Sequence, residues 1–370
     1  MRNNGATAGK LWIVDSDQTN ADLEKILEHA KVDSFSAAQT KINKELSEDS
    51  QGQKIYDYIE EPLVPVVYSM QEAGVLVDQK FFTKLSKEYH KELDKLATKI
   101  YKHAGREFNI KSPKQLSEVL FVDMELPTKG VKKSKTGAYS TNVKVLEKLH
   151  EEHEIIQLIM DYRELEKLLS TYIDVIPGMV GDDARLHAEF LQNGTVTGRF
   201  SSRNPNMQNI PTRTELGRKI REGFVAASGY ELVSFDYSQI ELRCLAILSG
   251  DPALVKIFQE GQDIHTAVAS LIGGVSPDNV DRDMRRKAKI VNFGILYGMG
   301  INSLKKQMGT DRAEAQVFYD GFFTQFPKAA GYLEGTKEFA RKHGYTKTLF
   351  GRRRQFKNIN SKLGFIRAMA

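Results

Sequence analysis

The spacing of apolar residues along the chain predicts a protein built mainly of helices. Across residues 55–70 the apolar positions recur at helical intervals, as on the buried face of an amphipathic helix. A longer helix is expected over residues 79–103, which are rich in Leu, Lys and Glu and are followed by a helix-ending glycine, Gly105. Helical patterns continue to residue 176, and we therefore expect residues 55–176 to form an elongated, mostly helical arm.

Two short strand-like runs lie beyond this arm. Residues 185–192 (RLHAEFLQ) and 231–236 (ELVSFD) have the length and apolar content of strands, and we expect residues 231–235 to be a buried strand. Helical spacing resumes at Ile240 and continues towards the end of the chain. The expected fold class is α+β, dominated by helices, with a small antiparallel sheet in the middle of the chain.

The first 54 residues carry the weakest pattern in the chain. Residues 10–17 (KLWIVDSD) are expected to form a short strand, and residues 22–44 a helix. No compact domain is evident in this segment. We therefore describe residues 1–54 as an N-terminal segment without a defined fold of its own.

Composition places the chain among ordinary globular proteins. Hydrophobic residues make up 41% and charged residues 27% of the 370 positions, which excludes wholesale disorder and collagen-like or disulfide-rich scaffolds. No apolar run is long enough to cross a bilayer, and the N-terminus lacks the pattern of a secretory signal. The single cysteine, Cys244, excludes an internal disulfide and a cysteine-rich metal site, and it fits a reducing, cytoplasmic setting.

The distribution of charge is more informative than the net charge of +5. Residues 199–221 contain six basic residues and one acidic residue, and residues 337–357 contain eight basic residues and one acidic residue. Such clusters on a nearly balanced background are either solvated helix faces or patches that bind an acidic polymer. The motifs within and around them have to decide between these interpretations.

The first candidate for chemistry is Asp236, which follows the expected strand 231–235. A carboxylate at the end of a buried strand points out of the sheet edge, where it could hold a divalent ion together with a neighbouring backbone carbonyl. Glu241 lies five residues further on, in the next expected helix. The alternative is that Asp236 only caps that helix, the commoner role of a lone aspartate at such a junction.

The second candidate is the segment 285–300 (RRKAKIVNFGILYGMG), in which charged and aromatic residues recur every four positions. Arg285, Lys289, Phe293 and Tyr297 would lie along one face of a helix. Two cations followed by an aromatic ring suit a nucleoside triphosphate, because the cations neutralise phosphates and the ring stacks on a base. An ordinary amphipathic helix with a basic end is the alternative.

The third candidate is a polar stretch, residues 197–211 (TGRFSSRNPNMQNIP), with few apolar residues. Its Asn and Gln side chains can hydrogen-bond base edges, and its Ser and Arg side chains can bind phosphates. A turn-rich loop is the alternative, but its length between two structured regions favours a function.

Taken together, these segments resemble the family A DNA polymerases, of the bacterial DNA polymerase I type. Besides the three candidates, the resemblance rests on motifs in the same order and spacing, from about residue 55 to residue 367: EEPLVPVVYSMQEAGVLVD (60–78), REFNIKSPKQL (106–116), YRELEKLLSTY (162–172), DYSQIELR (236–243), EGQDIHTA (260–267) and TLFGRRR (348–354). The resemblance implies a right-hand polymerase fold with an incomplete palm sheet. Residues 55–176 would form the start of the palm and the thumb, 177–245 palm strands with the first metal-binding aspartate, and 246–370 the fingers helices.

The resemblance also implies roles for single residues. Asp236, Arg285 and Lys289 match catalytic positions, and Asp236 and the Tyr237 carbonyl match a site for Mg²⁺, the expected cofactor. The implied nucleotide-binding residues are Gln239, Glu241, His265, Arg285, Lys289, Phe293 and Tyr297. The implied DNA-binding residues are Lys114, Ser170, Thr171, Arg199, Asn206, Gln208 and Asn209, together with the lysine-rich loop 129–135. The implied partners are primer-template DNA and dNTPs, with no membrane, in a bacterial or phage-infected cytoplasm near the nucleoid.

The chain departs from the family pattern in ways that bear on activity. We find no His-Asp-Glu motif, which in the family carries the second metal-binding carboxylate. Leu169 stands where the thumb motif usually has lysine, and residues 1–54 are too short for a proofreading exonuclease domain. We therefore expect the N-terminal portion of a polymerase core that either needs a separate C-terminal polypeptide or is a truncated gene product. The absence of nuclease domains favours a phage origin. The alternative is a non-catalytic DNA-binding protein derived from a polymerase; a single-subunit RNA polymerase fits poorly because of Glu241.

Overall fold

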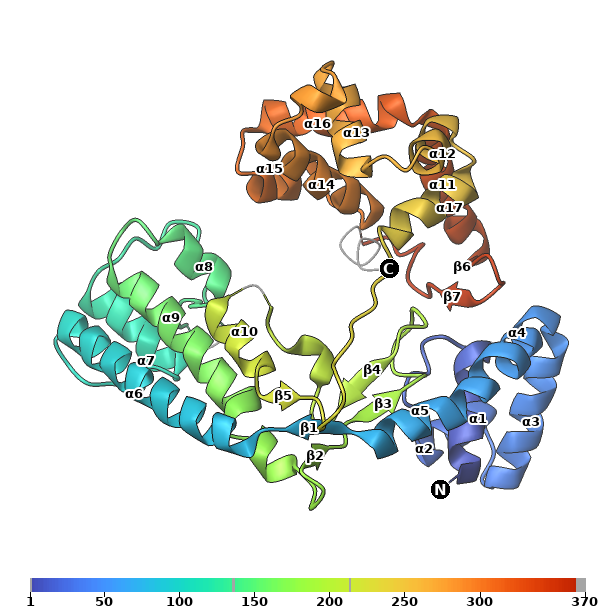
Figure 1. Ribbon diagram of the computed structural model, residues 1–370, viewed down its shortest axis with the longest axis horizontal. Coiled ribbons are helices and arrows are strands. Elements are labelled where there is room, and N and C mark those ends of the chain that lie inside the picture. Colours follow the sequence, from blue (N-terminus) through green and yellow to red (C-terminus); the bar gives the residue numbers. More distant parts are fainter. Residues whose placement is uncertain (1, 135–136, 213, 364–370) are drawn as a thin grey trace. The chain divides into compact units, whose positions relative to one another are not determined.

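The computed structural model describes residues 2–134, 137–212 and 214–363, and the chain divides into two compact units. One unit consists of Ile59–Val233, and the other joins Met1–Tyr58 to Ser234–Ala370 (Figure 1). Each unit has hydrophobic core clusters of its own. Helices dominate both units, so the expected helix-rich α+β class is confirmed. Across the described ranges, no helix combines the length and apolarity that a membrane crossing would require.

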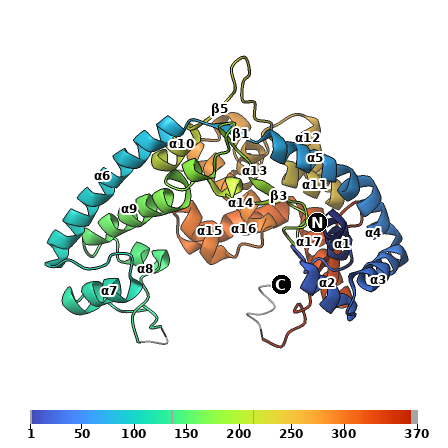
Figure 2. The same ribbon diagram turned by 90° about the horizontal axis from the view of Figure 1, so that it is seen from below.

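The unit Ile59–Val233 is built around two long helices that lie side by side in Figures 1 and 2. Its α-helices are α5 (Glu61–Ala73), α6 (Gln79–Ala104), α7 (Pro113–Glu118), α8 (Val143–Lys148), α9 (Ile155–Leu168) and α10 (Glu215–Arg221). Shorter helical turns are η2 (Val119–Asp123), η3 (Leu169–Ile173), η4 (Ile176–Met179) and η5 (Met207–Asn209), and η1 (Tyr56–Glu60) leads into α5. The two long helices are α6 and α9.

Helix α6 shows why the sequence pattern forms a helix here. The carboxylate of Asp78 accepts a hydrogen bond from the N–H of Phe81 and so caps the first turn. Gly105 ends the helix with a φ of +70°, a conformation in which glycine has no steric penalty. Between these ends the buried side chains recur at intervals of three or four positions: Phe82, Leu85, Tyr89, Leu93, Leu96 and Ile100. This stripe packs into the same core cluster as the apolar face of α9.

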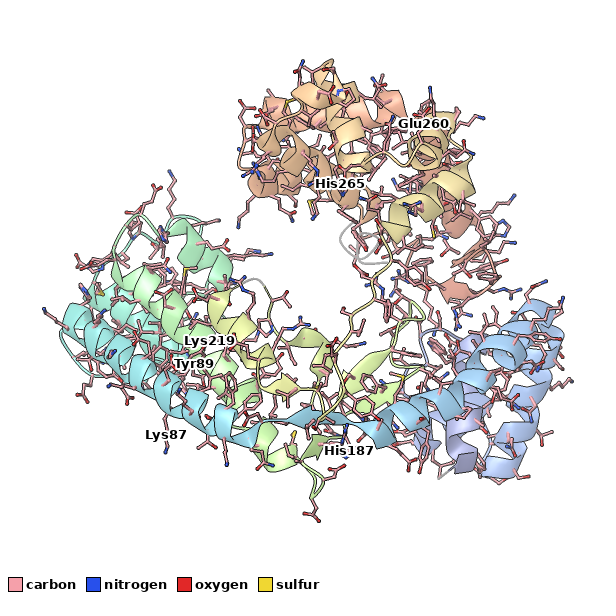
Figure 3. The ribbon with its side chains drawn as sticks, in the orientation of Figure 1. Lys87, Tyr89, His187, Lys219, Glu260 and His265 are labelled. Atoms are coloured by element: carbon pink, nitrogen blue, oxygen red, sulfur yellow. The ribbon has the colours of Figure 1, made fainter. Side chains whose placement is uncertain are left out.

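Two polar contacts join helix α10 to α6. The hydroxyl of Tyr89 donates to the carbonyl of Leu216 at 3.0 Å, and the ammonium of Lys219 lies 3.1 Å from the carboxylate of Glu88. Figure 3 shows Tyr89 and Lys219 on these two neighbouring helices. Burial, with the nearby carboxylate of Glu88, raises the pKa of Tyr89 to about 12, so the hydroxyl remains a proton donor at ordinary pH.

The expected antiparallel sheet is present in this unit and is small. Strand β1 (Val75–Val77) lies between β2 (Arg185–Leu186) and β5 (Phe224–Val225), and it is antiparallel to both. The register pairs Val75 with Leu186 and Leu76 with Val225. A separate hairpin joins β3 (Glu189–Leu191) to β4 (Ser201–Arg203). The strands predicted within residues 185–192 are therefore confirmed.

The strand predicted at residues 231–235 is wrong. These residues adopt no strand and are exposed, and Phe235 retains 92% of its accessible surface. A strand is stable only where a neighbouring strand accepts its backbone hydrogen bonds. None of the strand pairings within the described ranges includes residues 231–235.

The second unit contains the N-terminal helices and most of the C-terminal half of the chain. Its helices are α1 (Arg2–Val14), α2 (Leu23–Ala30), α3 (Phe35–Glu48), α4 (Ser50–Ile55), α11 (Ile240–Ser249), α12 (Pro252–Gln259), α13 (Ile264–Gly273), α14 (Arg282–Leu296), α15 (Ile301–Met308), α16 (Arg312–Gln325) and α17 (Pro327–His343), with the short turn η6 (Pro277–Asn279). Strands β6 (Tyr345–Lys347) and β7 (Arg353–Gln355) form a hairpin after α17. The expectation of helices alone after Ile240 is therefore corrected by this hairpin.

The N-terminal segment is folded, and its predicted strand is wrong. Residues 10–14 of that strand belong to α1. Ala8, Leu11 and Trp12 are buried at helical intervals, and Ala8 and Leu11 join a small cluster with α2 and α3. A four-residue apolar run fits either a strand or a helix, and only its packing partners decide between them. The helix expected over residues 22–44 is present as the two helices α2 and α3.

The β6–β7 hairpin packs against the N-terminal helices within this unit. The guanidinium of Arg352 lies over the ring of Trp12 at 4.6 Å, and the backbone N–H of Gln355 donates to the hydroxyl of Ser16. The ammonium of Lys357 lies 3.1 Å from the carboxylates of both Asp15 and Asp17. Part of the basic cluster 337–357 is therefore engaged inside the protein.

A buried aspartate ties two further helices of this unit together. Asp251 is fully buried, and one carboxylate oxygen accepts hydrogen bonds from the first N–H groups of α12. The other oxygen accepts hydrogen bonds from the N–H groups of Lys328 and Ala329 in the first turn of α17. Helix starts have unpaired N–H groups and favour negative charge, so one carboxylate stabilises both.

Candidate nucleotide and DNA sites

The predicted row of Arg285, Lys289 and Phe293 lies along an exposed face of α14. Asp281 caps this helix by accepting a hydrogen bond from the N–H of Met284. Arg285 and Lys289 are exposed, and Phe293 is half-buried. The opposite face is buried and contains Ala288, Val291, Asn292, Gly294 and Ile295. The helix thus presents two cations and one ring on the side turned away from the core.

Arg285 is paired with a carboxylate that the sequence analysis did not single out. Its Nε lies 3.1 Å from Oδ1 of Asp263, and its Nη2 lies 2.9 Å from Oδ2, which makes a two-pronged ion pair. Asp263 also caps α13, because its Oδ1 accepts hydrogen bonds from the N–H and the hydroxyl of Thr266. Partial burial of Asp263 works to raise its pKa, but the bonds from Arg285 and Thr266 outweigh burial and hold the pKa at about 2.

His265 lies two residues beyond Asp263, in the first turn of α13, and is buried (Figure 3). Its Nδ1 is 3.0 Å from Nδ2 of Asn292 on α14. Its ring is also 5.6 Å, centre to centre, from the ring of Phe293. Burial lowers the pKa of His265; Arg285 and Lys289 lower it further, and Asp263 opposes them. Predicted ligands from the two helices are therefore brought together where α13 meets α14.

Tyr297 and Glu241 form a second contact between predicted nucleotide-binding residues. Tyr297 directly follows α14 and is 63% exposed. Its hydroxyl donates to Oε1 of Glu241 at 3.2 Å, which joins the end of α14 to the first turn of α11. Gln239 precedes α11 with a φ of +53° and makes no side-chain cap hydrogen bond.

Asp236 and Tyr237 lie on the exposed stretch that precedes α11. Asp236 does not follow a strand, and α11 begins after Gln239 without a side-chain cap. Neither sequence interpretation of Asp236, as a strand-end carboxylate or as a helix cap, describes its surroundings here. Its role as a metal ligand stays a prediction.

Three predicted DNA-binding residues line one cavity in the unit Ile59–Val233. The cavity has a volume of about 580 Å³ and includes Thr171, Asn206 and Asn209 in its lining. The hydroxyl of Tyr172 donates to the backbone carbonyl of Asn209 at 2.6 Å, which holds η3 against η5. The predicted thumb residue Thr171 and the polar stretch 197–211 therefore meet, and the side chain of Lys167 adds a cation to the same lining.

The remaining residues of the polar stretch lie beside this cavity. Gln208 lines a neighbouring cavity of about 450 Å³ together with Arg221, and its side-chain amide donates to the carbonyl of Phe200. Arg199 and Ser170 are exposed. Arg213, within the basic cluster 199–221, lies outside the described residues.

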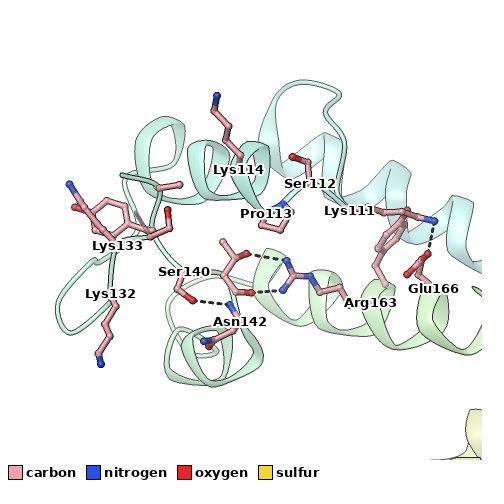
Figure 4. A pocket seen from close by; sticks show the side chains of 15 residues that line it. Lys111, Ser112, Pro113, Lys114, Lys132, Lys133, Ser140, Asn142, Arg163 and Glu166 are labelled. Atoms are coloured by element: carbon pink, nitrogen blue, oxygen red, sulfur yellow. Dashed lines mark hydrogen bonds and ion pairs between the residues drawn. The ribbon is translucent and has the colours of Figure 1, made fainter. Parts of the chain in front are cut away.

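Lys114 lines a separate basic pocket, to which α9 contributes Tyr162, Arg163 and Glu166 (Figure 4). The pocket has a volume of about 850 Å³, and Lys111, Lys132 and Lys133 also line it. The walls are held by Arg163, whose guanidinium donates to the carbonyl and hydroxyl oxygens of Thr141. The last residue of the lysine-rich loop 129–135 lies outside the described residues. Lys114 is thus grouped with other lysines and not with Thr171.

Comparison with known proteins identifies the family. Residues 79–370 match the family model described as DNA polymerase family A. The chain belongs to DNA polymerase family A. It is 47% identical over 317 residues to the thermostable DNA polymerase I of Thermus thermophilus and 46% identical over 316 residues to the DNA polymerase I of Deinococcus radiodurans. These matches cover 85% of this chain but only 38% and 33% of those two polymerases.

A solved structure is similar to nearly the whole chain. The POL domain of Pol1 from M. smegmatis, in complex with DNA primer-template and dNTP, superimposes with a TM-score of 0.87 and is 33% identical. The match covers 98% of this chain and 66% of that chain. The resemblance deduced from the sequence motifs is therefore confirmed.

Family A polymerases are metal-dependent, and Asp236 is the predicted magnesium ligand of this chain. Mg²⁺ is octahedral and is usually bound through carboxylates as well as substrate phosphates. Within residues 2–134, 137–212 and 214–363, no three His, Cys, Asp or Glu side chains come together as metal ligands. Asp236 and the Tyr237 carbonyl alone do not fit a site for two magnesium ions.

Two residues of this candidate site were missed from the sequence, Asp263 and Asn292. Both act across the contact between α13 and α14, which no local pattern reveals. One signal for Asp263 was available, because an aspartate directly before an apolar periodic run is a typical helix start. Asn292 interrupts the buried face of α14 with a polar side chain, which is a weaker signal of the same kind.

Proposed function

We propose that this chain supplies the nucleotide-binding and DNA-binding part of a template-directed DNA polymerase, which adds dNTPs to a primer 3′-hydroxyl. In this proposal residues 55–176 form the start of the palm and the thumb, 177–245 the palm strands, and 246–370 the fingers. The single cysteine and the proposed DNA substrate are the reasons to assign it to the cytoplasm.

One observation carries the proposal: Arg285, Lys289 and Phe293 share an exposed face of α14, and His265 lies against that helix. The triphosphate of a nucleotide needs several cations and hydrogen-bond donors at fixed spacing, and the base needs an aromatic ring on which to stack. A protein that only gripped DNA would have no use for this arrangement. The observation therefore favours a polymerase over the non-catalytic DNA-binding alternative.

The residues of this chain have separate tasks in the proposed reaction. The 3′-hydroxyl oxygen of the primer attacks the α-phosphorus, the bond to pyrophosphate breaks, and the hydroxyl proton is lost. Arg285 and Lys289 bind the phosphates that leave, and Phe293 stacks on the incoming nucleotide. Glu241 lies beside its sugar, and Tyr297, bonded to Glu241, borders the site of the templating base.

The DNA would be held by the polar surfaces of the unit Ile59–Val233. Thr171, Asn206 and Asn209 share a cavity with Lys167 and Glu164. Its cation and amide groups suit a nucleic-acid backbone and base edges. The lysines of the pocket around Lys114 would add contacts to phosphates, without sequence preference and with a strong dependence on salt.

Magnesium is the proposed cofactor, with Asp236 as one ligand. We propose that the second carboxylate belongs to a His-Asp-Glu segment, a motif that the 370 residues do not contain. Co-expression with a C-terminal family A segment that carries a His-Asp-Glu motif tests this: failure to co-purify counts against it.

Nucleotide binding tests the proposal without requiring catalysis. Titration with a fluorescent dATP analogue should show binding that Arg285→Ala and Lys289→Ala each weaken by about 10- to 100-fold, since a charge-assisted bond contributes about 1.5–3 kcal/mol. Arg286→Ala is the matched control, because Arg286 is bonded to Asp283 and to the carbonyl of Met308 instead. Equal loss in all three variants, or no binding by the unaltered chain, contradicts the proposal.

Primer extension on a primed template, with and without the C-terminal segment, then tests catalysis. Extension that depends on Asp236, and is lost in Asp236→Ala, supports a polymerase. Intact primer-template binding without nucleotide binding or extension under either condition supports the alternative, a DNA-binding protein derived from a polymerase.

A further inference from the structure

His265 and Asn292 form a buried polar pair beneath the exposed face of α14. His265 is 3% exposed and Asn292 is 0% exposed, and Nδ2 of the amide lies 3.0 Å from Nδ1 of the ring. The amide oxygen Oδ1 of Asn292 has no hydrogen-bond partner among the described groups. Buried polar groups normally have hydrogen-bond partners. The unpaired oxygen therefore indicates that stability alone does not explain this buried pair.

The amide nitrogen of Asn292, and not its oxygen, faces the histidine. An amide nitrogen carries two N–H donors, whereas the oxygen is an acceptor only. In this orientation Asn292 can therefore only donate to Nδ1 of His265.

This orientation fixes where the proton of the imidazole resides. Because Nδ1 of His265 accepts a hydrogen bond from Asn292, Nδ1 carries no proton, and the neutral ring must carry its proton on Nε2. Burial and the cations of Arg285 and Lys289 lower the pKa of His265, against the opposing charge of Asp263. The neutral ring with an Nε2–H donor is therefore the form expected at neutral pH.

We infer that Asn292 is a positioning residue for nucleotide binding, which holds His265 in the tautomer whose Nε2–H donates to a phosphate oxygen of the incoming dNTP. The inference rests on the proposed function, because it takes His265 to be a nucleotide ligand. A lone pair on Nε2 would repel a phosphate oxygen, whereas an N–H attracts it. Asn292 thus acts on the nucleotide only through the ring of His265.

The tautomer can be observed directly and without activity. Nitrogen-15 NMR of the full chain labelled at histidine, at about pH 8 and well above the ordinary histidine pKa of about 6.5, distinguishes Nδ1–H from Nε2–H. The His265 signals are assigned by their disappearance in His265→Gln. We expect the unaltered chain to show the Nε2–H form. An Nδ1–H form overturns the inference, whether or not any variant folds.

Asn292→Asp reverses the contact, because a carboxylate can only accept a hydrogen bond from Nδ1–H. We expect His265 in this variant to show Nδ1–H at about pH 8, and dNTP affinity to fall at least tenfold there. On acidification the ring gains a proton on Nε2 as well, and the affinity should recover as the pH falls through the histidine pKa. A merely structural role would give a loss that does not recover with pH, and that result overturns the inference.

Asn302→Asp is the matched control. It makes the same chemical change at an exposed position of the same unit, where Asn302 accepts from Arg312, and it should leave the His265 signals and dNTP affinity unchanged. The two proposals fail separately. An Nε2–H tautomer in a chain that binds no dNTP refutes the proposed function, whereas normal dNTP binding by the Asn292→Asp variant at about pH 8 refutes the role of Asn292 alone.

Discussion

The carboxylate of Asp263 makes two kinds of contact at once. It caps α13 through Thr266 and holds the guanidinium of Arg285 with two hydrogen bonds. The pair uses Nε and Nη2 of Arg285 and leaves Nη1 outside it. A triphosphate that binds Arg285 must either use this remaining nitrogen or compete with a carboxylate that is ionised at all ordinary pH values.

We expect Asp263→Asn to reduce the free energy of unfolding at neutral pH by about 1 kcal/mol, allowing for solvent screening of a partly exposed pair. Asparagine keeps the helix cap but loses the charge. The pKa of Asp263 is lowered from 3.8 to about 2, so its contribution is present above pH 3.8 and is lost as the pH falls towards 2. Urea denaturation of both chains across this range measures the difference.

Asp281→Asn provides the comparison for that prediction, because Asp281 caps α14 in the same way. Its effect on the urea midpoint should be smaller than that of Asp263→Asn at neutral pH. If the two variants lose the same stability, the ion pair with Arg285 contributes nothing beyond the cap.

At the scale of elements, close packing of a turn on α6 fixes the edge of the small sheet. Gly223 precedes β5, and its N–H and carbonyl groups take part in the turn that brings β5 to β1. A Cβ atom on Gly223 would overlap the ring of Phe82, which is fully buried in the core of that unit. Position 223 therefore requires glycine because of space.

Gly223→Ala should destabilise the unit Ile59–Val233 by about 1–3 kcal/mol, the usual cost of overpacking a core. Thermal or urea unfolding, followed by circular dichroism, measures the loss. Gly178→Ala in η4 is the control, since a Cβ there meets no atom within 4 Å. A Gly223→Ala chain as stable as the control would show that Phe82 moves aside without cost.

The hairpin β6–β7 offers a test that needs only intrinsic fluorescence. Trp12 is the single tryptophan of the chain, and the guanidinium of Arg352 covers its ring. We expect Arg352→Ala to change the emission of Trp12 and to lower stability by about 0.5–1 kcal/mol. Arg354→Ala is the matched variant, because Arg354 lies over Phe356 instead and should leave the emission unchanged.

Features that depend on one helix could be predicted from the sequence, whereas features that depend on contacts between distant elements could not. The face of Arg285, Lys289 and Phe293 followed from helical spacing alone, because all its members lie on one element. The strand 231–235 could not be predicted correctly, because a strand depends on partners elsewhere in the chain. Asp263 and Asn292 were missed for the same reason, since their contacts join two different helices.

At the scale of the whole molecule, two units with separate cores are joined through exposed chain. From residue 231 to residue 238 every position is exposed, and Tyr230, Leu232, Phe235 and Tyr237 present large apolar side chains there. Segments with few buried contacts are where proteases cut folded proteins first.

Limited chymotrypsin digestion should therefore cut first between Tyr230 and Tyr237, giving two fragments that mass spectrometry identifies. Trypsin is the built-in control, because residues 222–242 contain neither lysine nor arginine. First cleavage elsewhere, for example after the exposed Tyr68 in α5, would show that residues 230–237 are protected in solution.

The discontinuous unit has a consequence for the order of events during synthesis. Residues 1–58 leave the ribosome before the unit Ile59–Val233, yet Ser16 meets its hydrogen-bond partner Gln355 only 339 residues later. The whole of Ile59–Val233 emerges in between and, having its own core, can fold before the N-terminal helices find the hairpin. Until the hairpin has been synthesised, the N-terminal helices are held together by their small shared cluster. This interval is the stage at which a chaperone would be most useful.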